Sequence, residues 1–372
     1  MSLLGKGLPF VFPPAIATQV PSQTSLCRSM PRRSLTYAAG IAGAFLALRL
    51  VLRNIHRIDF EGRTVVITGG RGLALELARR YAREGARIAL LARDRAELQR
   101  AQRELERMGT EVYVHVCDIR NQDEVHAAVN AILDRFGRID VLVNNAGVMQ
   151  VGPIENMSVD VFRDAMAVHT WGPLYLTLAV APHMKRRGEG RIVNISSIGG
   201  LVAVPHLVPY CTSKFALTGL SDGMRAELAK DGIRVSTICP GLMRTGSHVN
   251  AYFLGQHEKE FAWFAISAAN PLLSTRARGA ARRIVEASRY GDPRVILTVQ
   301  AKILHAGNAL FPSVIAAGTK LAARLLPETR PGTGNEMKTG WESRSNRAPS
   351  ILTRPADRAI LLNNEFDGHA GS

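Results

Sequence analysis

The chain has 372 residues and carries 47 Lys and Arg against 31 Asp and Glu, which gives a formal net charge of +16. Its four cysteines include no CxxC pair, which excludes a dense disulfide framework, and no His, Cys or carboxylate cluster has metal-ligand spacing, so no metal site is expected. Residues 1–57 hold seven Lys or Arg and no acid, and residues 258–326 hold ten basic residues against four acidic ones. Without a nucleic-acid motif, these basic flanks favour membrane lipid over nucleic acid as a partner.

The N-terminal region predicts a leader followed by a membrane anchor. Residues 1–34 are mostly unpatterned and rich in Pro and Ser, which is typical of disorder. Residues 35–52 form an apolar, helix-compatible run that contains Arg49 near its end. We therefore expect an anchor helix over 35–57, with a buried amphipathic helix or a cleaved signal peptide as alternatives.

The next segment has the pattern of a strand, a glycine-rich turn, a helix and a second strand. Residues 64–68 are a short apolar run that predicts a buried strand. Gly69, Gly70 and Gly72 then predict a tight turn, a strong helix pattern starts at Leu73, and residues 87–92 predict another strand. Such a unit binds the pyrophosphate of a dinucleotide at the start of its helix. A plain βαβ unit without a ligand is the alternative.

The alternation of strands and helices continues and predicts the fold class. Residues 111–118, 141–147, 190–197 and 233–241 read as further strands, and residues 123–136 and 159–184 as helices between them. This order predicts an α/β domain over 58–257 with a doubly wound parallel sheet, the Rossmann fold. Ligands bind such sheets beyond the carboxyl ends of the strands. Several distinctive residues follow strands at that edge, namely Gly69, Arg93, Asp118, Asn144, Ser197 and Pro240.

Tyr210 and Lys214 stand four residues apart in the string YCTSK, and Ser197 lies thirteen residues upstream of Tyr210 in NISSIGG. Residues at this spacing share one face of a helix. A neighbouring ammonium favours the phenolate and lowers the pKa of the tyrosine toward the range where it exchanges protons at neutral pH. A serine hydroxyl beside them can hold a substrate oxygen. Alone, a YxxxK string is equally a coincidence on an ordinary helix.

Taken together, these strings resemble the short-chain dehydrogenase/reductase superfamily. The matching strings are TGGRGLA, CDI, NNAG, NISS, YCTSK and CPGLMRT, in the family's order, between about residues 60 and 250. The region that follows is similar to a bacterial subgroup with a membrane-anchored N-terminus.

The resemblance implies a role for each catalytic residue. Tyr210 would be the general acid/base, Lys214 would lower its pKa and bind the nicotinamide ribose, and Ser197 rather than Ser196 would orient the substrate carbonyl. His169 stands where the family usually has an Asn that helps to hold a water in a proton relay. Both a working relay through His169 and a purely structural histidine remain open.

The resemblance also implies the cofactor site. Asn144 would brace the central strand beside the cofactor, and Thr245 would lie near its carboxamide. The expected cofactor-binding residues are Thr68, Gly69, Gly70, Arg71, Gly72, Leu73, Arg93, Asp118, Ile119, Asn145, Ala146, Gly147, Tyr210, Lys214, Pro240, Gly241 and Thr245.

Arg93 indicates which dinucleotide is preferred. NAD-binding members carry an acid at the end of the second strand, whereas this strand ends in Ala92-Arg93, with Asp94 one place later. A guanidinium matches the charge and geometry of a 2′-phosphate. We therefore expect NADP(H) in preference to NAD(H), with Arg71 as a second cation. A solvated Arg93 paired with Asp94 is the alternative.

The expected function is that of an oxidoreductase that transfers hydride between NADP(H) and a carbonyl or secondary alcohol of an apolar, lipid-like substrate. The glycine turn is one residue shorter than the family's TGxxxGxG and has Ala74 in the last place. The shortened turn and His169 together support an alternative function, a catalytically impaired nucleotide-binding sensor or scaffold at the membrane. A third hypothesis is a lipid-binding or anchoring protein. A homo-oligomer stays open. Residues 258–327 are expected to form a substrate lid and C-terminal helices, and residues 328–372 a mostly disordered tail.

Overall fold

The computed structural model describes residues 43–44, 48, 51, 53–329 and 334–366. The chain divides into two compact units, Met1–Leu52 and Arg53–Ser372. The expected leader and most of the expected anchor lie outside the described residues. In the part of the chain that is described, no helix is long and apolar enough to cross a membrane. The second unit begins where Arg53 Nε pairs with Asp292 Oδ1 at 2.9 Å.

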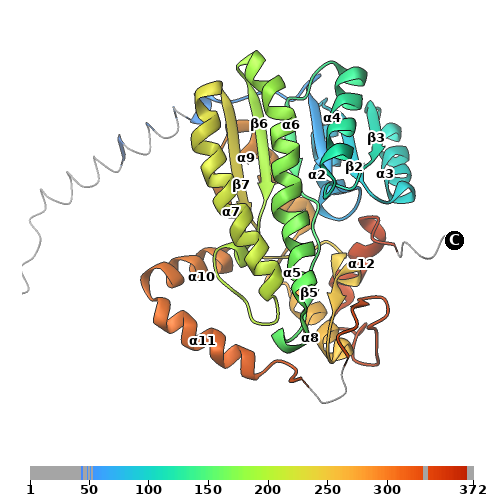
Figure 1. Ribbon diagram of the computed structural model, residues 1–372, viewed down its shortest axis with the longest axis vertical. Coiled ribbons are helices and arrows are strands. Elements are labelled where there is room, and N and C mark those ends of the chain that lie inside the picture. The colour runs from blue at the N-terminus through green and yellow to red at the C-terminus, as the bar shows by residue number, and fades with distance from the viewer. Residues whose placement is uncertain (1–42, 45–47, 49–50, 52, 330–333, 367–372) are drawn as a thin grey trace, which may run out of the picture. The chain divides into compact units, whose positions relative to one another are not determined.

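The second unit is built on a seven-stranded sheet, with strand order β11-β7-β6-β4-β1-β2-β3. Every neighbouring pair in it is parallel, so all carboxyl ends of the strands lie at one edge (Figure 1). The strand order reverses beside β1, the point where doubly wound sheets bind ligands. The strands are β1 (Thr64–Thr68), β2 (Arg87–Ala92), β3 (Val112–Val116), β4 (Val141–Asn144), β6 (Gly190–Ile195), β7 (Ile233–Cys239) and β11 (Arg294–Ile296).

Both faces of the sheet are covered because its strands are apolar on both sides. Along β1, Val65 and Ile67 belong to one buried cluster and Val66 to the other, as the alternation of side chains in a strand requires. The first cluster is closed by α2 (Leu73–Ala82), α3 (Arg95–Arg107) and α9 (Ala277–Tyr290). The second is closed by α4 (Gln122–Phe136) and α6 (Gly172–Arg187), which lie in front of the sheet together with α7 (Val208–Leu228) (Figure 1).

The predicted α/β class and parallel sheet are confirmed, with two local differences. A seventh strand, β11, was not predicted, because its three residues run directly into the apolar pattern of the helices after it. The segment 159–184, predicted as one helix, is α5 (Val159–Met166), a π-helical turn (Ala167–Trp171) and α6. Single π-turns within helices are frequent at functional sites.

The prediction that residues 328–372 are mostly disordered is wrong for residues 334–366. Strand β12 (Lys338–Thr339) pairs with β9 (Tyr252–Phe253), which in turn pairs with β5 (Gln150–Val151). The remaining elements are three-residue strands, helices and short 3-10 turns. They are β8 (Leu242–Arg244), β10 (Ser274–Arg276), α8 (His257–Ala269), α10 (Val299–Leu310), α11 (Pro312–Arg324), α12 (Arg354–Leu362) and the 3-10 turns Ile154–Asn156, Ile198–Gly200, Ala229–Asp231 and Ser247–Asn250.

Candidate functional site

The structure brings Ser197, Tyr210 and Lys214 together at the carboxyl edge of the sheet. Ser197 follows the end of β6, and its Oγ accepts a hydrogen bond from the Gly199 N–H at 3.0 Å. Tyr210 and Lys214 lie one turn apart near the start of α7. The Lys214 Nζ lies 5.7 Å from the centre of the Tyr210 ring and donates to the Ile195 carbonyl at 2.8 Å. That bond ties the lysine to the last residue of β6.

The neighbouring serine has a different place. Ser196 Oγ donates to the Lys214 carbonyl at 3.1 Å and lies 2.7 Å from Thr218 Oγ1, so it is used in packing α7 against β6. Ser197 is instead hydrogen-bonded to the Tyr210 side chain. The geometry therefore favours Ser197 as the serine that accompanies the phenol.

Burial controls the proton affinities of Tyr210 and Lys214. Burial raises the pKa of Tyr210 to about 12, and the hydrogen bond with Ser197 opposes that rise. Burial also lowers the pKa of Lys214 to about 7. We expected Lys214 to lower the pKa of Tyr210, but burial raises that pKa here, and the opposing influence is the hydrogen bond with Ser197 rather than the ammonium.

His169 is a buried, neutral imidazole in the π-helical turn. Burial, with the charge of Lys214, lowers its pKa well below the ordinary value. Its Nε2 accepts from the Val148 N–H at 3.1 Å, which assigns the proton to Nδ1, 2.7 Å from Ser213 Oγ. The Ser213 hydroxyl donates onward to the Tyr210 carbonyl at 2.9 Å. Both ring nitrogens are thus engaged by the chain, which favours the structural alternative over a proton relay.

The predicted Asn motif fixes two strand ends against each other. Thr68 Oγ1 accepts hydrogen bonds from the Asn145 and Ala146 N–H groups, both at 2.8 Å, so the end of β1 holds the loop after β4. Asn144 Nδ2 donates to Asn194 Oδ1 at 2.7 Å, which links β4 to β6. This bond holds the two central strands together at their carboxyl ends. Further along the loop after β4, only a glycine fits at Gly147, since a Cβ there would lie 2.9 Å from His169 Nε2.

The glycine turn presents N–H groups at the start of α2, where a helix attracts anions. Gly72 occupies the left-handed region, with φ of 58°, and a Cβ there would collide with the Glu365 carboxylate. The Gly70 N–H donates to Glu97 Oε1 at 2.6 Å, and the Gly72 N–H donates to the Asn363 carbonyl at 2.8 Å. The donor set fits the phosphates of a dinucleotide in kind. In this structure, oxygens of the chain itself accept these two bonds.

The cations expected to select the dinucleotide lie beside this turn. Arg71 Nε is 3.5 Å from carboxylate oxygens of both Glu97 and Glu365. Arg93 is exposed at the end of β2 and has no ion pair among the described residues. The Asp94 carboxylate instead caps α3, accepting from the Ala96 N–H at 2.7 Å. Arg93 is therefore not neutralised by Asp94.

The remaining predicted residues are distributed along the same edge. The Thr245 carbonyl accepts from Asn363 Nδ2 at 2.9 Å, and the Pro240 carbonyl accepts from the Ile198 N–H at 2.7 Å. A Cβ at Gly241 would lie 2.6 Å from Thr298 Oγ1. Asp118 forms an ion pair with Arg120 at 2.6 Å. Leu73 and Ile119 are buried beside the turn and strand ends they follow.

Sequence reasoning missed the residues that lie over the glycine turn. Asn363, Asn364 and Glu365 come from the C-terminal tail, and all three are buried. Their polar composition is typical of a solvated tail, and no local motif marks their destination. Only their contacts with residues more than a hundred positions away show it.

Comparisons with known proteins agree with this geometry. A family model described as short chain dehydrogenase matches residues 63–252. A dehydrogenase/reductase SDR family member 7B from Danio rerio is 38% identical over 224 residues, which cover 58% of this chain and 72% of that protein. A putative ketoacyl reductase from Streptomyces coelicolor is 37% identical over 188 residues, covering 50% of this chain and 72% of the relative. The crystal structure of a short-chain dehydrogenase from Streptomyces avermitilis aligns with a TM-score of 0.60 at 27% identity, over 70% of this chain and 97% of that one.

Proposed function

We propose that this chain uses NADP(H) on an apolar, lipid-like substrate at a membrane. The chain belongs to the short-chain dehydrogenase family and is an NAD(P)-dependent oxidoreductase of CH–OH and C=O groups. The observation that carries the proposal is the Ser197, Tyr210 and Lys214 trio at the carboxyl edge of the sheet. The cofactor would supply the hydride. The side chains of the trio would supply the proton and orient the substrate oxygen.

The roles of the trio follow from the donors that each residue offers. The Tyr210 hydroxyl would give its proton to the substrate oxygen during reduction and take it back during oxidation. The Ser197 hydroxyl, already bonded to that phenol, would hold the same oxygen. Lys214 would favour the phenolate and bind ribose hydroxyls. A negatively charged ligand beside Lys214 would stabilise its ammonium, and that positive charge would lower the pKa of Tyr210.

The preference for NADP(H) is supported by the guanidinium of Arg93, which forms no ion pair within 4 Å in the described part of the chain. It is exposed at the end of β2, where an acid would bind a ribose hydroxyl in an NAD enzyme. Because Asp94 is engaged as the cap of α3, the charge of Arg93 is available to a 2′-phosphate.

The apolar substrate class is supported by what packs beside Tyr210. The Tyr210 ring contacts a buried cluster that includes Leu207, Phe253 and Phe261. A substrate carbonyl that reaches the phenol would bring its flanking groups toward Met149, Val204 and Trp263, which are partly buried and pack against the same cluster. The name of the Streptomyces coelicolor relative, putative ketoacyl reductase, is consistent with an acyl-chain ketone.

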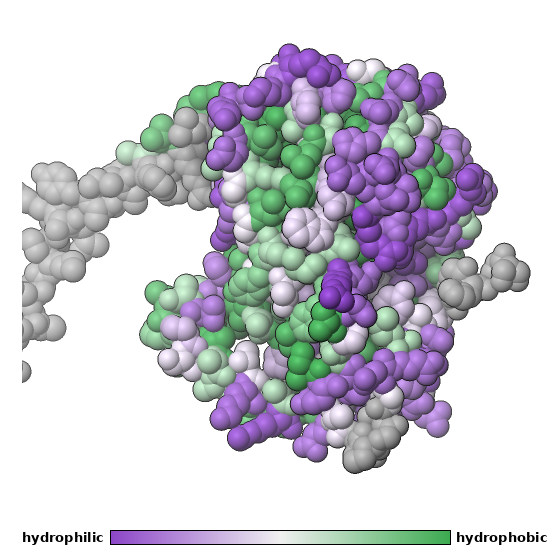
Figure 2. All heavy atoms as spheres, viewed as in Figure 1, coloured by the Kyte–Doolittle hydropathy of each residue, from purple (hydrophilic) through white to green (hydrophobic). Residues whose placement is uncertain are grey.

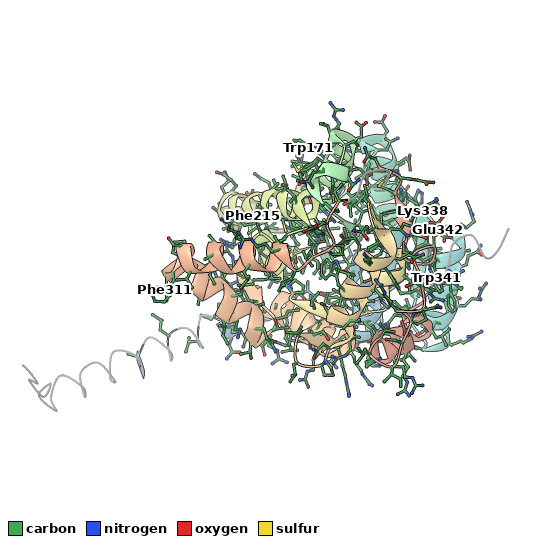
Figure 3. The ribbon with its side chains drawn as sticks, turned by 90° about the horizontal axis from the view of Figure 1, so that it is seen from below. Trp171, Phe215, Phe311, Lys338, Trp341 and Glu342 are labelled. Atoms are coloured by element: carbon green, nitrogen blue, oxygen red, sulfur yellow. The ribbon has the colours of Figure 1, made fainter. Side chains whose placement is uncertain are left out.

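Association with a membrane is supported by the α10–α11 arm, residues 299–325. Its large apolar side chains are exposed, with 62% of Phe311 and 66% of Val314 accessible, and Phe311 lies at the turn between the helices (Figure 3). Hydrophobic residues are interspersed with hydrophilic ones over this arm (Figure 2). The same pattern suits a lipid interface, with Lys302 and Lys320 near headgroups.

Trp171 and Phe215, exposed on neighbouring helices, support a homo-oligomer as a further proposal (Figure 3).

One observation favours the second candidate, a nucleotide-binding sensor or scaffold of low activity. Two N–H groups of the glycine turn are bound by oxygens of the chain, one from the Glu97 carboxyl group and one from the Asn363 carbonyl. A substrate screen separates the two candidates. The purified full chain is incubated with NADPH and long-chain ketones, long-chain aldehydes or 3-oxoacyl thioesters, and oxidation of NADPH is followed. Turnover with one class supports the oxidoreductase proposal, and cofactor binding without turnover on any class supports the sensor.

A further inference from the structure

The end of the described C-terminal segment lies on the glycine turn. Helix α12 ends at Leu362, and residues 363–366 follow it; we call these four residues the tail segment. The Asn363 carbonyl accepts from the Gly72 N–H at 2.8 Å, and Asn363 Nδ2 donates to the Thr245 carbonyl at 2.9 Å. One residue thus joins the turn after β1 to the loop after β7.

The next residue covers the other side of the turn. Asn364 Nδ2 donates to the Gly70 carbonyl at 3.0 Å and to the Glu97 carbonyl at 3.1 Å, and its Oδ1 accepts from Arg100 Nε. Asn364 has a φ of 59°, a left-handed conformation that Asn adopts more readily than most residues. Every hydrogen-bonding atom of this side chain is used in the contact.

Glu365 places a buried carboxylate beside the turn. It is 1% exposed, accepts from Asn250 Nδ2 at 2.7 Å, and lies 3.5 Å from Arg71 Nε. Its Oε1 lies so close to Gly72 that a Cβ on the glycine would collide with it. A carboxyl oxygen of the chain thus occupies the place at the start of α2 where a helix and a guanidinium together attract an anion, although burial raises the pKa of Glu365 to about 7.

We propose that the tail segment is an intramolecular competitor of the dinucleotide, which binds the cofactor cradle in place of the cofactor and must leave before the cofactor binds. The inference rests on the proposed NADP(H)-dependent function. The competition follows from the contacts, because the Gly72 N–H, the Arg71 guanidinium and the Thr245 carbonyl are all engaged by residues 363–365. A cofactor at the turn needs the same hydrogen-bonding groups and the same space.

The size of the effect follows from population arithmetic. If the tail segment is docked about 90% of the time, the binding-competent fraction is about one tenth, and the apparent Kd of the cofactor is about tenfold weaker than the intrinsic value. Because the tail is part of the chain, its effective concentration stays high whatever the protein concentration. The competition should therefore be independent of dilution.

The test uses full-length variants that weaken docking without touching the cradle. Glu365→Ala removes the carboxylate, and Glu365→Lys places a like charge beside Arg71. The matched controls are Glu336→Ala and Glu336→Lys, because Glu336 is an exposed acid of the same tail that pairs with Lys338. The Kd of NADPH is measured by its fluorescence, and hydrogen–deuterium exchange is followed in the peptide that covers 354–366, with and without NADPH.

We expect both Glu365 variants to bind NADPH about tenfold more tightly than the wild type, and both Glu336 variants to bind like the wild type. We also expect NADPH to speed exchange in the wild-type tail peptide. Equal Kd values in all five proteins, with unchanged exchange on adding NADPH, would overturn the competition and leave the proposed function standing. Fast exchange in the Glu365 variants without NADPH binding to any protein would instead refute the proposed cofactor, and the competition with it.

Discussion

At the scale of single residues, the trio is held in place by bonds to the ends of secondary structure. Lys214 donates to the last residue of β6, and Ser197 receives an N–H from the turn that follows the same strand. Burial in these positions raises the pKa of Tyr210 to about 12 and lowers the pKa of Lys214 to about 7. Each group is thereby shifted toward its neutral form. We therefore expect an anionic ligand beside Lys214 to favour its ammonium form and so to lower the pKa of Tyr210.

Replacing Tyr210 by Phe should remove the proton donor and keep the ring that packs beside Leu207. We expect the rate of turnover to fall by about 10²–10⁴, the usual loss when general acid/base catalysis is removed. Cofactor affinity should change little. Tyr175→Phe, a half-buried tyrosine on α6, is the matched control and should keep its rate. A Tyr210→Phe enzyme with more than about half the wild-type rate would exclude the proposed role.

Replacing Arg93 by Ala should change the choice of dinucleotide. Loss of a charge-assisted contact costs about 1.5–3 kcal/mol, so NADP(H) affinity should fall about tenfold or more while NAD(H) affinity is nearly unchanged. Titrations of both cofactors measure the ratio. Arg95→Ala, an exposed arginine at the start of α3, serves as the control. An unaltered ratio in Arg93→Ala would contradict the assignment of NADP(H).

Lys214 should destabilise the cofactor-free fold most strongly at low pH. Its pKa is about 7 in the folded chain and about 10.4 when unfolded, so the unfolded state binds more protons between these values. Stability of the wild type should then rise with pH over that window, by about 1.4 kcal/mol per pH unit from this residue. Lys214→Met lacks this contribution. Denaturant unfolding of both proteins at pH 7 and pH 9 measures it, and a difference in unfolding free energy that does not vary with pH would show that the lysine is not desolvated.

At the scale of elements, hydrophobic periodicity and apolar runs predicted those helices and strands whose bounds are set by the local sequence. β1 and β2 have their predicted bounds, because each is a continuous buried run followed by a turn signal. β11 was missed because its three residues carry no pattern of their own. The place of residues 363–365 was not predictable, because it is set by contacts with Gly72, Thr245 and Asn250, which are distant in sequence. The Ser197–Tyr210–Lys214 part of the site was visible in the sequence, and the tail was not.

The α10–α11 arm should bind lipid through its exposed apolar side chains. The double variant Phe311→Ser with Val314→Ser should weaken association with vesicles of anionic phospholipid by more than tenfold, since burying each large apolar side chain contributes about 1.5–3 kcal/mol. A sedimentation assay in a chain lacking residues 1–52 separates the arm from the proposed anchor. The matched control is Ile351→Ser with Leu352→Ser, which replaces two equally exposed apolar residues elsewhere. Identical binding of the two double variants would argue against the arm as a lipid surface.

At the scale of the whole second unit, the parallel sheet gathers every proposed functional group at one edge. The glycine turn follows β1, Arg93 follows β2, Asn144 ends β4, and Ser197 follows β6. Family membership and this convergence establish an oxidoreductase. The proposal adds that hydride passes between NADP(H) and an apolar ketone or alcohol, with the proton supplied by the chain.

The most direct measurement uses NADPH that carries deuterium at the transferable position of its nicotinamide. The full chain is incubated with the ketone or 3-oxoacyl compound that gives turnover, and the product is analysed by mass spectrometry. We predict that the product alcohol carries one deuterium on its carbinol carbon, and that Tyr210→Phe forms this product at least about a hundredfold more slowly. An alcohol without deuterium, or a fully active Tyr210→Phe enzyme, would contradict the account.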